Sequence, residues 1–429
     1  RMNILLIVVD TLRASRLGCY GYPLPVSPRI DALAREGLLF ENCIAPGIPT
    51  TPAHTTLYTG LHPIEHNIVS HGGAVDLDRK IDVLPELLQQ TGVTTAAVDN
   101  LVDIKPWLGR GYEFYINPSF RHKLRLMITA EEVNARAIPW LMSHSRESFF
   151  LFVHYWDPHT PYAPPTGYER FYPKSRDRFS AQFNSMERLK EQPLWRMFGD
   201  IWFNKLGPVT DADYVSSLYD AEIRYVDDGI AALLEALEAS GAADDTMVVL
   251  VGDHGESLTE HDIYFDHHGL YEDVVRVPLI IRAPGRVRAG NRHPGMVSHI
   301  DVAPTIMAAA GGPVSPAMRG RDLLAGSLSP DEPIVCCECT WQAKWGVRTS
   351  NRKYIESRKP DHHNMPLYEL YDLVADPNEQ VNLAPNRPDE VQQWHTWLNE
   401  WITHALERCG RSEDPLEAQE LTLGKRWYR

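Results

Sequence analysis

The sequence predicts an α/β fold with a mostly parallel central sheet, helices on both faces, and a small α+β subdomain at the C-terminal end. Short apolar runs alternate with helical patterns from the first residues onward, which is typical of βαβ units. These runs are apolar throughout, as strands buried on both faces are. The chain has 429 residues, and because domains usually hold roughly 100–200 residues, we expect one large unit with an appendage.

The elements of the large unit follow from these patterns in chain order. Ser27 and Pro28 predict a helix start, and Gly37 predicts its end. A long amphipathic helix is expected from Val215 to Ala239, before Gly241. The strands predicted for the central sheet are Ile4–Val9, Val93–Val98, Phe149–Val153, Met247–Val251 and Pro278–Ile281.

Two segments depart from this alternation. Residues 164–212 are rich in Arg, Lys and aromatic residues and read as a helical insertion, either a lid over a site or a solvated surface hairpin. We expect residues 1–325 to form the main α/β domain and residues 326–429 a C-terminal subdomain of short antiparallel strands and a helix. The segments predicted there are Ile334–Cys339, Trp345–Thr349, Lys353–Ser357, Leu367–Tyr371 and a helix from Asp389 to Arg408.

Composition and charge exclude several classes of protein. With 23% charged and 10% aromatic residues, the chain is not disordered or fibrous. Lys and Arg number 42 against 57 Asp and Glu, a net charge of −15 that repels nucleic-acid backbones. The apolar run Asn3–Val9 is too short for a membrane span and has no signal-peptide pattern. We therefore expect a cytoplasmic protein that binds neither nucleic acid nor membrane, with its oligomeric state open.

Polar residues follow four of the expected strands. Asp10, Asp99-Asn100, His154 and Asp253-His254 come directly after apolar runs. Ligands bind at the carboxyl ends of strands in open parallel sheets, so these residues predict a shared site, although each alone would be an ordinary turn. Asp253 and His254 pair a carboxylate with an imidazole, as Zn²⁺ and Mn²⁺ sites do.

The segment from Pro49 to Gly60 adds a hydroxyl to this set. Pro52 fits the first turn of a helix, so Thr50 is expected at the helix N-terminus, where free N–H groups favour an anion. A metal-bound Thr50 hydroxyl could act as a nucleophile. The alternative role of Thr50, as a plain N-cap, stays open, and Thr51 is the competing hydroxyl.

Five stretches, in order, resemble the sulfatase family within the alkaline-phosphatase superfamily. The resemblance covers nearly the whole chain except the insertion. The stretches are Asn3–Arg13 with Gly18–Tyr22; Thr50–Gly60; His154–Tyr162; Val251–Glu256 with Val277–Ile281; and Leu367–Leu373 with Asp376-Pro377 and Asn382-Leu383.

The resemblance implies roles for individual residues. It implies a small anionic ester as substrate, and it implies that Asp10, Asp253 and His254 hold one divalent cation with Thr50. The donor types, hard oxygens with one imidazole, favour Zn²⁺ or Mn²⁺ over Ca²⁺ or Mg²⁺, and no ligands are assigned for a second metal. His159 is implied to bind or protonate the ester oxygens.

By its spacing to Arg276 and Pro278, His267 stands where many sulfatases have a lysine that contacts the substrate anion, with His268 and His261 as alternatives. The residues expected to contact substrate are His54, Asn100, His154 and His268.

Departures from the family pattern shape the functional hypothesis. Sulfatases carry Cys or Ser, then x-Pro-x-Arg, and oxidise the first residue to formylglycine; here Thr50 and His54 occupy these positions. Thr11 replaces a second acid, and no Gly-Lys-Trp-His element follows Val98. Threonine nucleophiles elsewhere in the superfamily act on phosphoryl groups.

We therefore expect a metal-dependent hydrolase that cleaves a phosphate monoester, diester or phosphonate ester through Thr50. The first alternative is a sulfate-ester hydrolase working without formylglycine. The second is a ligand-binding member of the fold without turnover.

Overall fold

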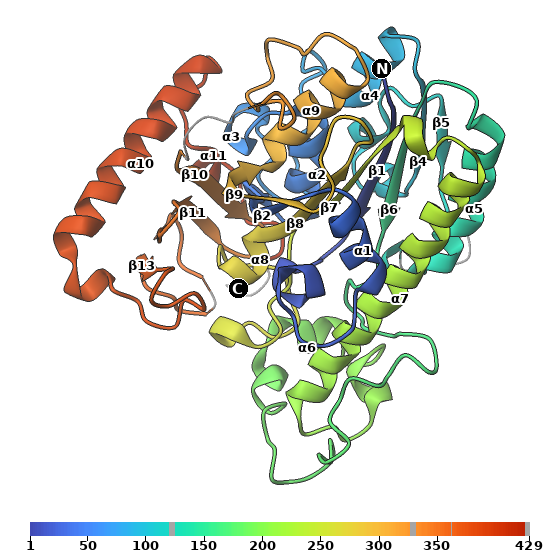
Figure 1. Cartoon of the computed structure of the whole chain (residues 1–429). Coiled ribbons are helices and arrows are strands. Elements are labelled where there is room, and N and C mark those ends of the chain that lie inside the picture. Colours follow the sequence, from blue (N-terminus) through green and yellow to red (C-terminus); the bar gives the residue numbers. More distant parts are fainter. Residues whose placement is uncertain (120–124, 327–331, 362, 425–429) are drawn as a thin grey trace.

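A computed structural model describes residues 1–119, 125–326, 332–361 and 363–424 (Figure 1). At its centre lies an eight-stranded sheet, among these residues, in the order β5-β4-β6-β1-β7-β8-β2-β9. Its strands are β1 (Asn3–Val9), β2 (Leu38–Ile44), β4 (Thr94–Val98), β5 (Phe114–Ile116), β6 (Phe149–Tyr155), β7 (Thr246–Gly252), β8 (Arg276–Arg282) and β9 (Asn291–Ser298). The predicted mostly parallel α/β sheet is confirmed.

The register of the three central strands places their ends at one level. β1 pairs in parallel with β6 on one side and with β7 on the other, and Val9 lies opposite both Tyr155 and Gly252. The residues that follow β1 and β7 therefore emerge side by side at the carboxyl edge of the sheet. Each central strand is apolar because both of its faces are covered.

Three strands of this sheet, β2, β5 and β9, were not predicted. One of the predicted strands, β8, is antiparallel to its neighbours. β8 is antiparallel to both β7 and β2, yet it is as apolar as its parallel neighbours because burial does not depend on strand direction. The unpredicted strands carry weaker signals, since β2 contains the polar pair Glu41-Asn42 and the edge strand β9 contains Pro294. β5 has only three residues.

Helices cover both faces of the sheet. α1 (Pro28–Glu36), α5 (Ala130–His144) and α7 (Ala212–Ala239) pack together on one face, and α2 (Thr50–Thr59), α4 (Leu84–Gln90) and α9 (Val302–Ala309) pack together on the other (Figure 1). The shorter helices are α3 (Pro63–His66), α6 (Pro193–Phe198), α8 (Glu272–Val275) and α11 (Pro415–Ala418).

The C-terminal part forms a second, smaller sheet with its own core. Its strand order is β13-β12-β11-β10-β3, and the long helix α10 (Pro388–Arg408) lies on the outer side in Figure 1. The strands are β10 (Ile334–Cys339), β11 (Ala343–Arg348), β12 (Arg352–Ser357), β13 (Tyr368–Asp372) and β3 (Gly47–Ile48). β3 comes from the segment just before α2, so this sheet is continuous with the chain that carries Thr50. The expected division at residue 325 stays a prediction.

The segment from 164 to 212 extends below the sheet in Figure 1 and consists mainly of turns with the short helix α6. Some of its apolar side chains, including Leu189, Trp202 and Phe203, are buried and join the main core, whereas Phe179, Met197 and Ile201 are exposed. No helix in the described ranges is both long enough and apolar enough to cross a membrane.

Candidate active site

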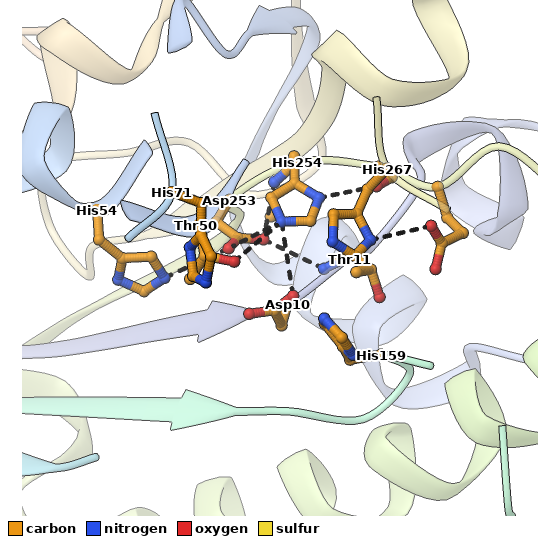
Figure 2. A network of polar contacts seen from close by, with 12 residues as sticks. Asp10, Thr11, Thr50, His54, His71, His159, Asp253, His254 and His267 are labelled. Carbon is orange, nitrogen blue, oxygen red and sulfur yellow. Dashed lines mark hydrogen bonds and ion pairs between the residues drawn. The ribbon is translucent and has the colours of Figure 1, made fainter. Parts of the chain in front are cut away.

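The site begins with two carboxylates that the central strands place together. Asp10 follows β1 and Asp253 follows β7, and both are fully buried. The backbone N–H groups of Thr11 and His254 donate to Asp253 Oδ1, at 3.1 and 2.7 Å. These two bonds fix the carboxylate and leave its Oδ2 turned toward the centre of the cluster in Figure 2.

His254 is oriented so that one ring nitrogen faces the carboxylates. Its Nδ1 lies 2.9 Å from the carbonyl oxygen of Gly255, which selects the tautomer with a proton on Nδ1. Its Nε2 lies 3.6 Å from Asp10 Oδ1, 3.4 Å from Asp253 Oδ2 and 3.3 Å from Thr50 Oγ1 (Figure 2). An unprotonated Nε2 surrounded by oxygen donors is the arrangement of a metal ligand.

Two glycines let Asp253 and His254 approach the rest of the site. A Cβ on Gly252 would lie 2.9 Å from the carbonyl oxygen of Leu12, and one on Gly255 would lie 1.9 Å from that of Asp273. The backbone on each side of Asp253-His254 is therefore packed against other backbone, which explains the Gly-Asp-His-Gly sequence.

Thr50 is the first residue of α2, as the sequence predicts, and is almost completely buried. The N–H groups of the first turn of a helix have no partner within the helix, so negative charge is favoured beside Thr50. The neighbouring Thr51 turns elsewhere, because its Oγ1 lies 2.9 Å from His71 Nδ1. Of the two hydroxyls, Thr50 faces the carboxylate and imidazole cluster.

The electrostatics of this cluster fit a divalent cation. Burial and the neighbouring Asp253 carboxylate raise the pKa of Asp10 to about 7. Asp10 Oδ1 and Asp253 Oδ2 are buried without a hydrogen-bond partner among the described residues. Burial lowers the pKa of His254 to about 4, so its imidazole is neutral at pH 7. Two facing carboxylates, a neutral imidazole and a hydroxyl are donors that a divalent cation binds.

Two further histidines lie next to the cluster and differ in environment. Burial opposes a charge on His267, but the Glu256 carboxylate, 3.2 Å from His267 Nδ1, raises the pKa of His267 to about 10. Burial and the adjacent His267 hold the pKa of His159 well below its usual value. The Nδ1 of His159 lies 2.6 Å from the Thr160 carbonyl oxygen, so its Nε2 is left for other contacts. The two rings lie 4.9 Å apart.

A cavity of about 320 Å³ opens onto Thr50. Its polar lining includes Thr50, His71, His159 and His267, and its remaining wall is mainly apolar and aromatic. The other lining residues are Pro49, Ile104, Leu126, Trp156, Thr340, Trp341 and Leu423. These residues come from segments outside 164–212, and the lid role of that insertion stays a prediction. Thr340, Trp341 and Leu423 belong to the C-terminal part.

Of the four residues expected to contact substrate, none is among the described residues that line this cavity, and two contact the carboxylates of the cluster. His54 is buried under Thr50, with Nε2 3.4 Å from Asp253 Oδ2. His154 lies between two carboxylates, with Nε2 3.1 Å from Asp10 Oδ2 and Nδ1 2.9 Å from Asp99 Oδ1. Their substrate contacts stay predictions.

The other two of the four contact side chains outside the cluster. Asn100 Oδ1 accepts a hydrogen bond from the Trp156 indole at 2.8 Å, so this amide orients a wall of the cavity. His268 Nε2 lies 2.8 Å from His363 Nε2.

Sequence reasoning missed several residues that the structure brings to the site. His71 and Glu256 contact Thr51 and His267, and Trp156 and Trp341 form part of the cavity wall. Glu256 lies within the Gly-Asp-His-Gly-Glu run and could have been found there. His71 stands in a loop between Ser70 and Gly72, which carries no local signal.

The fold and the site together define a hydrolase that acts on ester bonds. The Sulfatase family model matches residues 2–312, and the chain belongs to this family, within the alkaline phosphatase superfamily. It is 27% identical to the multifunctional alkaline phosphatase superfamily protein PehA of Trinickia caryophylli, over 90% of this chain and 91% of that one. It is 23% identical to an N-acetylglucosamine-6-O-sulfatase of Bacteroides thetaiotaomicron, over 89% of this chain and 82% of that one.

Among solved structures, the phosphonate monoester hydrolase of Agrobacterium radiobacter has the same fold. The TM-score is 0.74 at 21% identity, covering 95% of this chain and 96% of that chain. Relatives and structural neighbours thus include both sulfate-ester and phosphonate-ester hydrolases.

Proposed function

We propose that this protein is a metal-dependent hydrolase that cleaves phosphate monoesters, diesters or phosphonate esters with Thr50 as its nucleophile. The observation that carries the proposal is the position of the Thr50 hydroxyl, 3.3 Å from His254 Nε2, beside Asp10 and Asp253 and at the N-terminus of α2. A threonine cannot be oxidised to the aldehyde of formylglycine, so its direct use as a nucleophile is the simplest chemistry available there.

The ligands for the cation are Asp10, Asp253, His254 and Thr50. A bound divalent cation supplies Lewis acidity, which lowers the pKa of a coordinated hydroxyl and neutralises charge that develops on the ester. The donor set of carboxylate oxygens and one imidazole suits Zn²⁺ or Mn²⁺ better than Ca²⁺ or Mg²⁺.

We assign nucleophilic attack, proton transfer and binding of the ester to individual side chains. In the first step, the Thr50 hydroxyl gives its proton to solvent water and its Oγ1 forms a bond to phosphorus, while the bond from phosphorus to the leaving oxygen breaks. The ion pair with Glu256 favours the imidazolium form of His267, which faces the cavity and can give its proton to the leaving oxygen. His159 presents Nε2 to the same cavity, and the N-terminus of α2 favours the anionic ester. Water then hydrolyses the phosphothreonine, which regenerates Thr50.

The choice of a phosphoryl or phosphonyl ester rests on Thr50, and the character of the cavity supports an apolar organic group on that ester. No lysine or arginine is among the described residues that line it, and Trp156, Trp341 and Ile104 supply apolar surface. The similarity to a phosphonate monoester hydrolase and to a multifunctional superfamily protein is consistent with this choice. A sulfate ester is the second candidate, because the N-acetylglucosamine-6-O-sulfatase relative carries that activity in its name.

The test begins with the state of Thr50. Intact-mass and peptide analysis of the resting enzyme should find unmodified threonine, and rapid quench with an aryl phosphodiester should trap a phosphate adduct on Thr50. Thr50→Ala should lower the rate of the chemical step by roughly 10³-fold or more, since covalent catalysis is removed.

Thr51→Ala is the matched control, because its hydroxyl contacts His71 instead of the cluster, and it should be mild. An adduct on another residue, or an active Thr50→Ala enzyme, would refute the assignment. Comparing aryl phosphate, phosphodiester, phosphonate and sulfate esters on metal-reconstituted enzyme then decides the substrate class, and a clear preference for sulfate would favour the second candidate.

A further inference from the structure

Next to the ligands assigned above, a buried histidine is left without any hydrogen bond. His54 is fully buried on α2, and neither Nδ1 nor Nε2 has a hydrogen-bond partner in the described part of the chain. Burying an unpaired polar nitrogen is unfavourable, so such a group points to a missing partner. The Asp253 Oδ2 atom lies 3.4 Å from His54 Nε2.

His54 belongs to a second set of ligand atoms that shares a carboxylate with the first. Asp10, His54 and His154 each offer one atom, and these atoms lie within 4.8 Å of one another, as do those of Asp10, Asp253 and His254. The two oxygens of Asp10 face opposite sides, with Oδ1 3.6 Å from His254 Nε2 and Oδ2 3.1 Å from His154 Nε2. Asp10 is therefore placed to bridge two cations.

Asp253 can serve both sides in the same way. Its Oδ2 lies 3.4 Å from His54 Nε2 and 3.4 Å from His254 Nε2, and its Oδ1 is held by two backbone N–H groups. The carboxylate thus cannot turn away, and its free oxygen stays between the two imidazoles.

The orientation of His154 is fixed by groups behind it. Its Nδ1 lies 2.9 Å from Asp99 Oδ1, and Asp99 Oδ2 accepts bonds from Tyr115 Oη at 2.7 Å and from the Leu101 N–H at 3.0 Å. A carboxylate that receives the Nδ1 proton leaves Nε2 as an unprotonated donor, which is the usual support for a metal-binding histidine. Here Nε2 points at Asp10.

The charge of the region leaves room for more than one cation. Asp10, Asp99 and Asp253 are buried together, and across the described ranges their recorded ion pairs are all with histidines. Buried carboxylates without Lys or Arg partners are stabilised when metal ions supply the positive charge.

We propose that Asp10, Asp253, His54 and His154 form a second divalent-cation site adjacent to the first, with Asp10 and Asp253 shared by both. The ligand set of two imidazoles and two carboxylates is of the type that Zn²⁺ and Mn²⁺ occupy. This inference rests on the proposed metal-dependent function, since it takes the first site as given, and it explains why a histidine replaces the arginine of the family pattern at position 54.

The test counts metal ions without reference to activity. The full-length chain is titrated with Zn²⁺ under equilibrium dialysis, and bound metal is measured by elemental analysis. We expect saturation at two ions per chain for the wild type and at one for His54→Gln, because glutamine removes the imidazole donor. The control is His66→Gln, the same change at another buried histidine, whose Nε2 contacts Thr56 Oγ1 at 2.9 Å; it should still bind two.

Because the His54→Gln variant could fail to fold, a second measurement uses the wild-type chain. Carboxylate-bridged Mn²⁺ ions couple magnetically, so the fully Mn²⁺-loaded wild type should give an exchange-coupled electron paramagnetic resonance spectrum instead of the six lines of isolated Mn²⁺. Saturation of the wild type at one ion, with the six-line spectrum, would overturn the second site and leave the proposed function standing. Two ions in His54→Gln would also overturn the ligand assignment, and no bound ion at all would refute both proposals.

Discussion

Two clusters of buried charge in this molecule are built in opposite ways. The first lies at the sheet edge and is formed by Asp10, Asp253 and His254, whose carboxylates face histidines; we call it the metal cluster because it holds the ligands proposed for the cation. The second, the interface cluster, consists of Glu272, Arg348, Lys353 and Glu379 and joins the main domain to the C-terminal sheet. In it, Lys353 Nζ lies 2.8 Å from Glu272 and 2.9 Å from Glu379, and Arg348 lies 3.1 Å from Glu272.

The difference shows which buried charges the chain balances by itself. The interface cluster contains its own cations, so its carboxylates are satisfied as the chain folds. The metal cluster has acids but no lysine or arginine opposite them among the ion pairs of the described residues, so in the proposed function a bound cation balances their charge. Function at one cluster and stability at the other should therefore be separable by mutation.

The largest effect is expected from removing a carboxylate of the metal cluster. Asp253→Ala takes away an anionic ligand, so the protein should lose bound metal and its kcat/KM should fall by roughly 10³-fold or more, as for loss of a central catalytic element. Elemental analysis and steady-state kinetics measure the two losses. Lys353→Met should keep its metal, and a metal-replete, active Asp253→Ala enzyme would contradict the role of this cluster.

The sequence predicts the metal cluster better than it predicts its surroundings. Asp10 and Asp253 could be found because each ends a strongly apolar strand, and the structure sets these strands side by side in register. His71 and Trp341 reach the cavity from loops, where neither apolar periodicity nor residue spacing indicates position.

The same reasoning explains which parts of the fold escaped prediction. Strand β2 carries polar residues in its middle, and edge strand β9 is half exposed, so neither gives the continuous apolar run by which the central strands were found. The pairing of β3 with β10 joins residues nearly three hundred positions apart, and no local pattern specifies such a contact.

The second effect in size is expected at the interface cluster. Lys353→Met leaves Glu272 and Glu379 without their main counterion, and breaking a buried pair in this way typically costs about 3–5 kcal/mol of unfolding free energy. Urea unfolding of the metal-loaded protein measures the change. About 1 kcal/mol is the typical size of a mutational effect. If the unfolding free energy of the variant lies within that amount of the wild-type value, Glu272 and Glu379 do not need Lys353 as their counterion.

Removing the metal should lower the unfolding free energy by a somewhat smaller amount, and this effect should depend on the metal cluster alone. A ligand that binds only the folded state stabilises it by about 2.7 kcal/mol at one hundred times its Kd, so adding Mn²⁺ to chelated protein should raise the unfolding free energy by that order. Lys353→Met should show the same gain and Asp253→Ala none. Equal gains in both variants would indicate that the metal binds elsewhere.

The smallest expected effect is on the pH dependence of stability, and it concerns a buried histidine outside the metal cluster, His62. His54 has no hydrogen bond on either ring nitrogen, whereas the buried His62 has both satisfied: its Nε2 lies 2.9 Å from the Val335 carbonyl oxygen, and its Nδ1 accepts from the Ile64 N–H at 3.1 Å. These bonds hold His62 neutral where α3 meets the C-terminal sheet. Burial lowers the pKa of His62 to about 4, and the bond to Val335 offsets this only in part.

The sign of the resulting pH dependence follows from this shift. An unfolded histidine has a pKa of about 6.5, so between pH 6.5 and 4 the unfolded chain binds a proton that the native chain does not, and stability falls as the pH falls. For His62 the loss amounts to about 2 kcal/mol between pH 7 and pH 5. Urea unfolding of wild type and His62→Gln at both pH values isolates the contribution of His62 to the pH dependence of the unfolding free energy, because glutamine does not titrate. The wild type should lose about 2 kcal/mol more than the variant; equal losses would show that His62 is protonated in the folded protein and that its two hydrogen bonds do not hold it neutral.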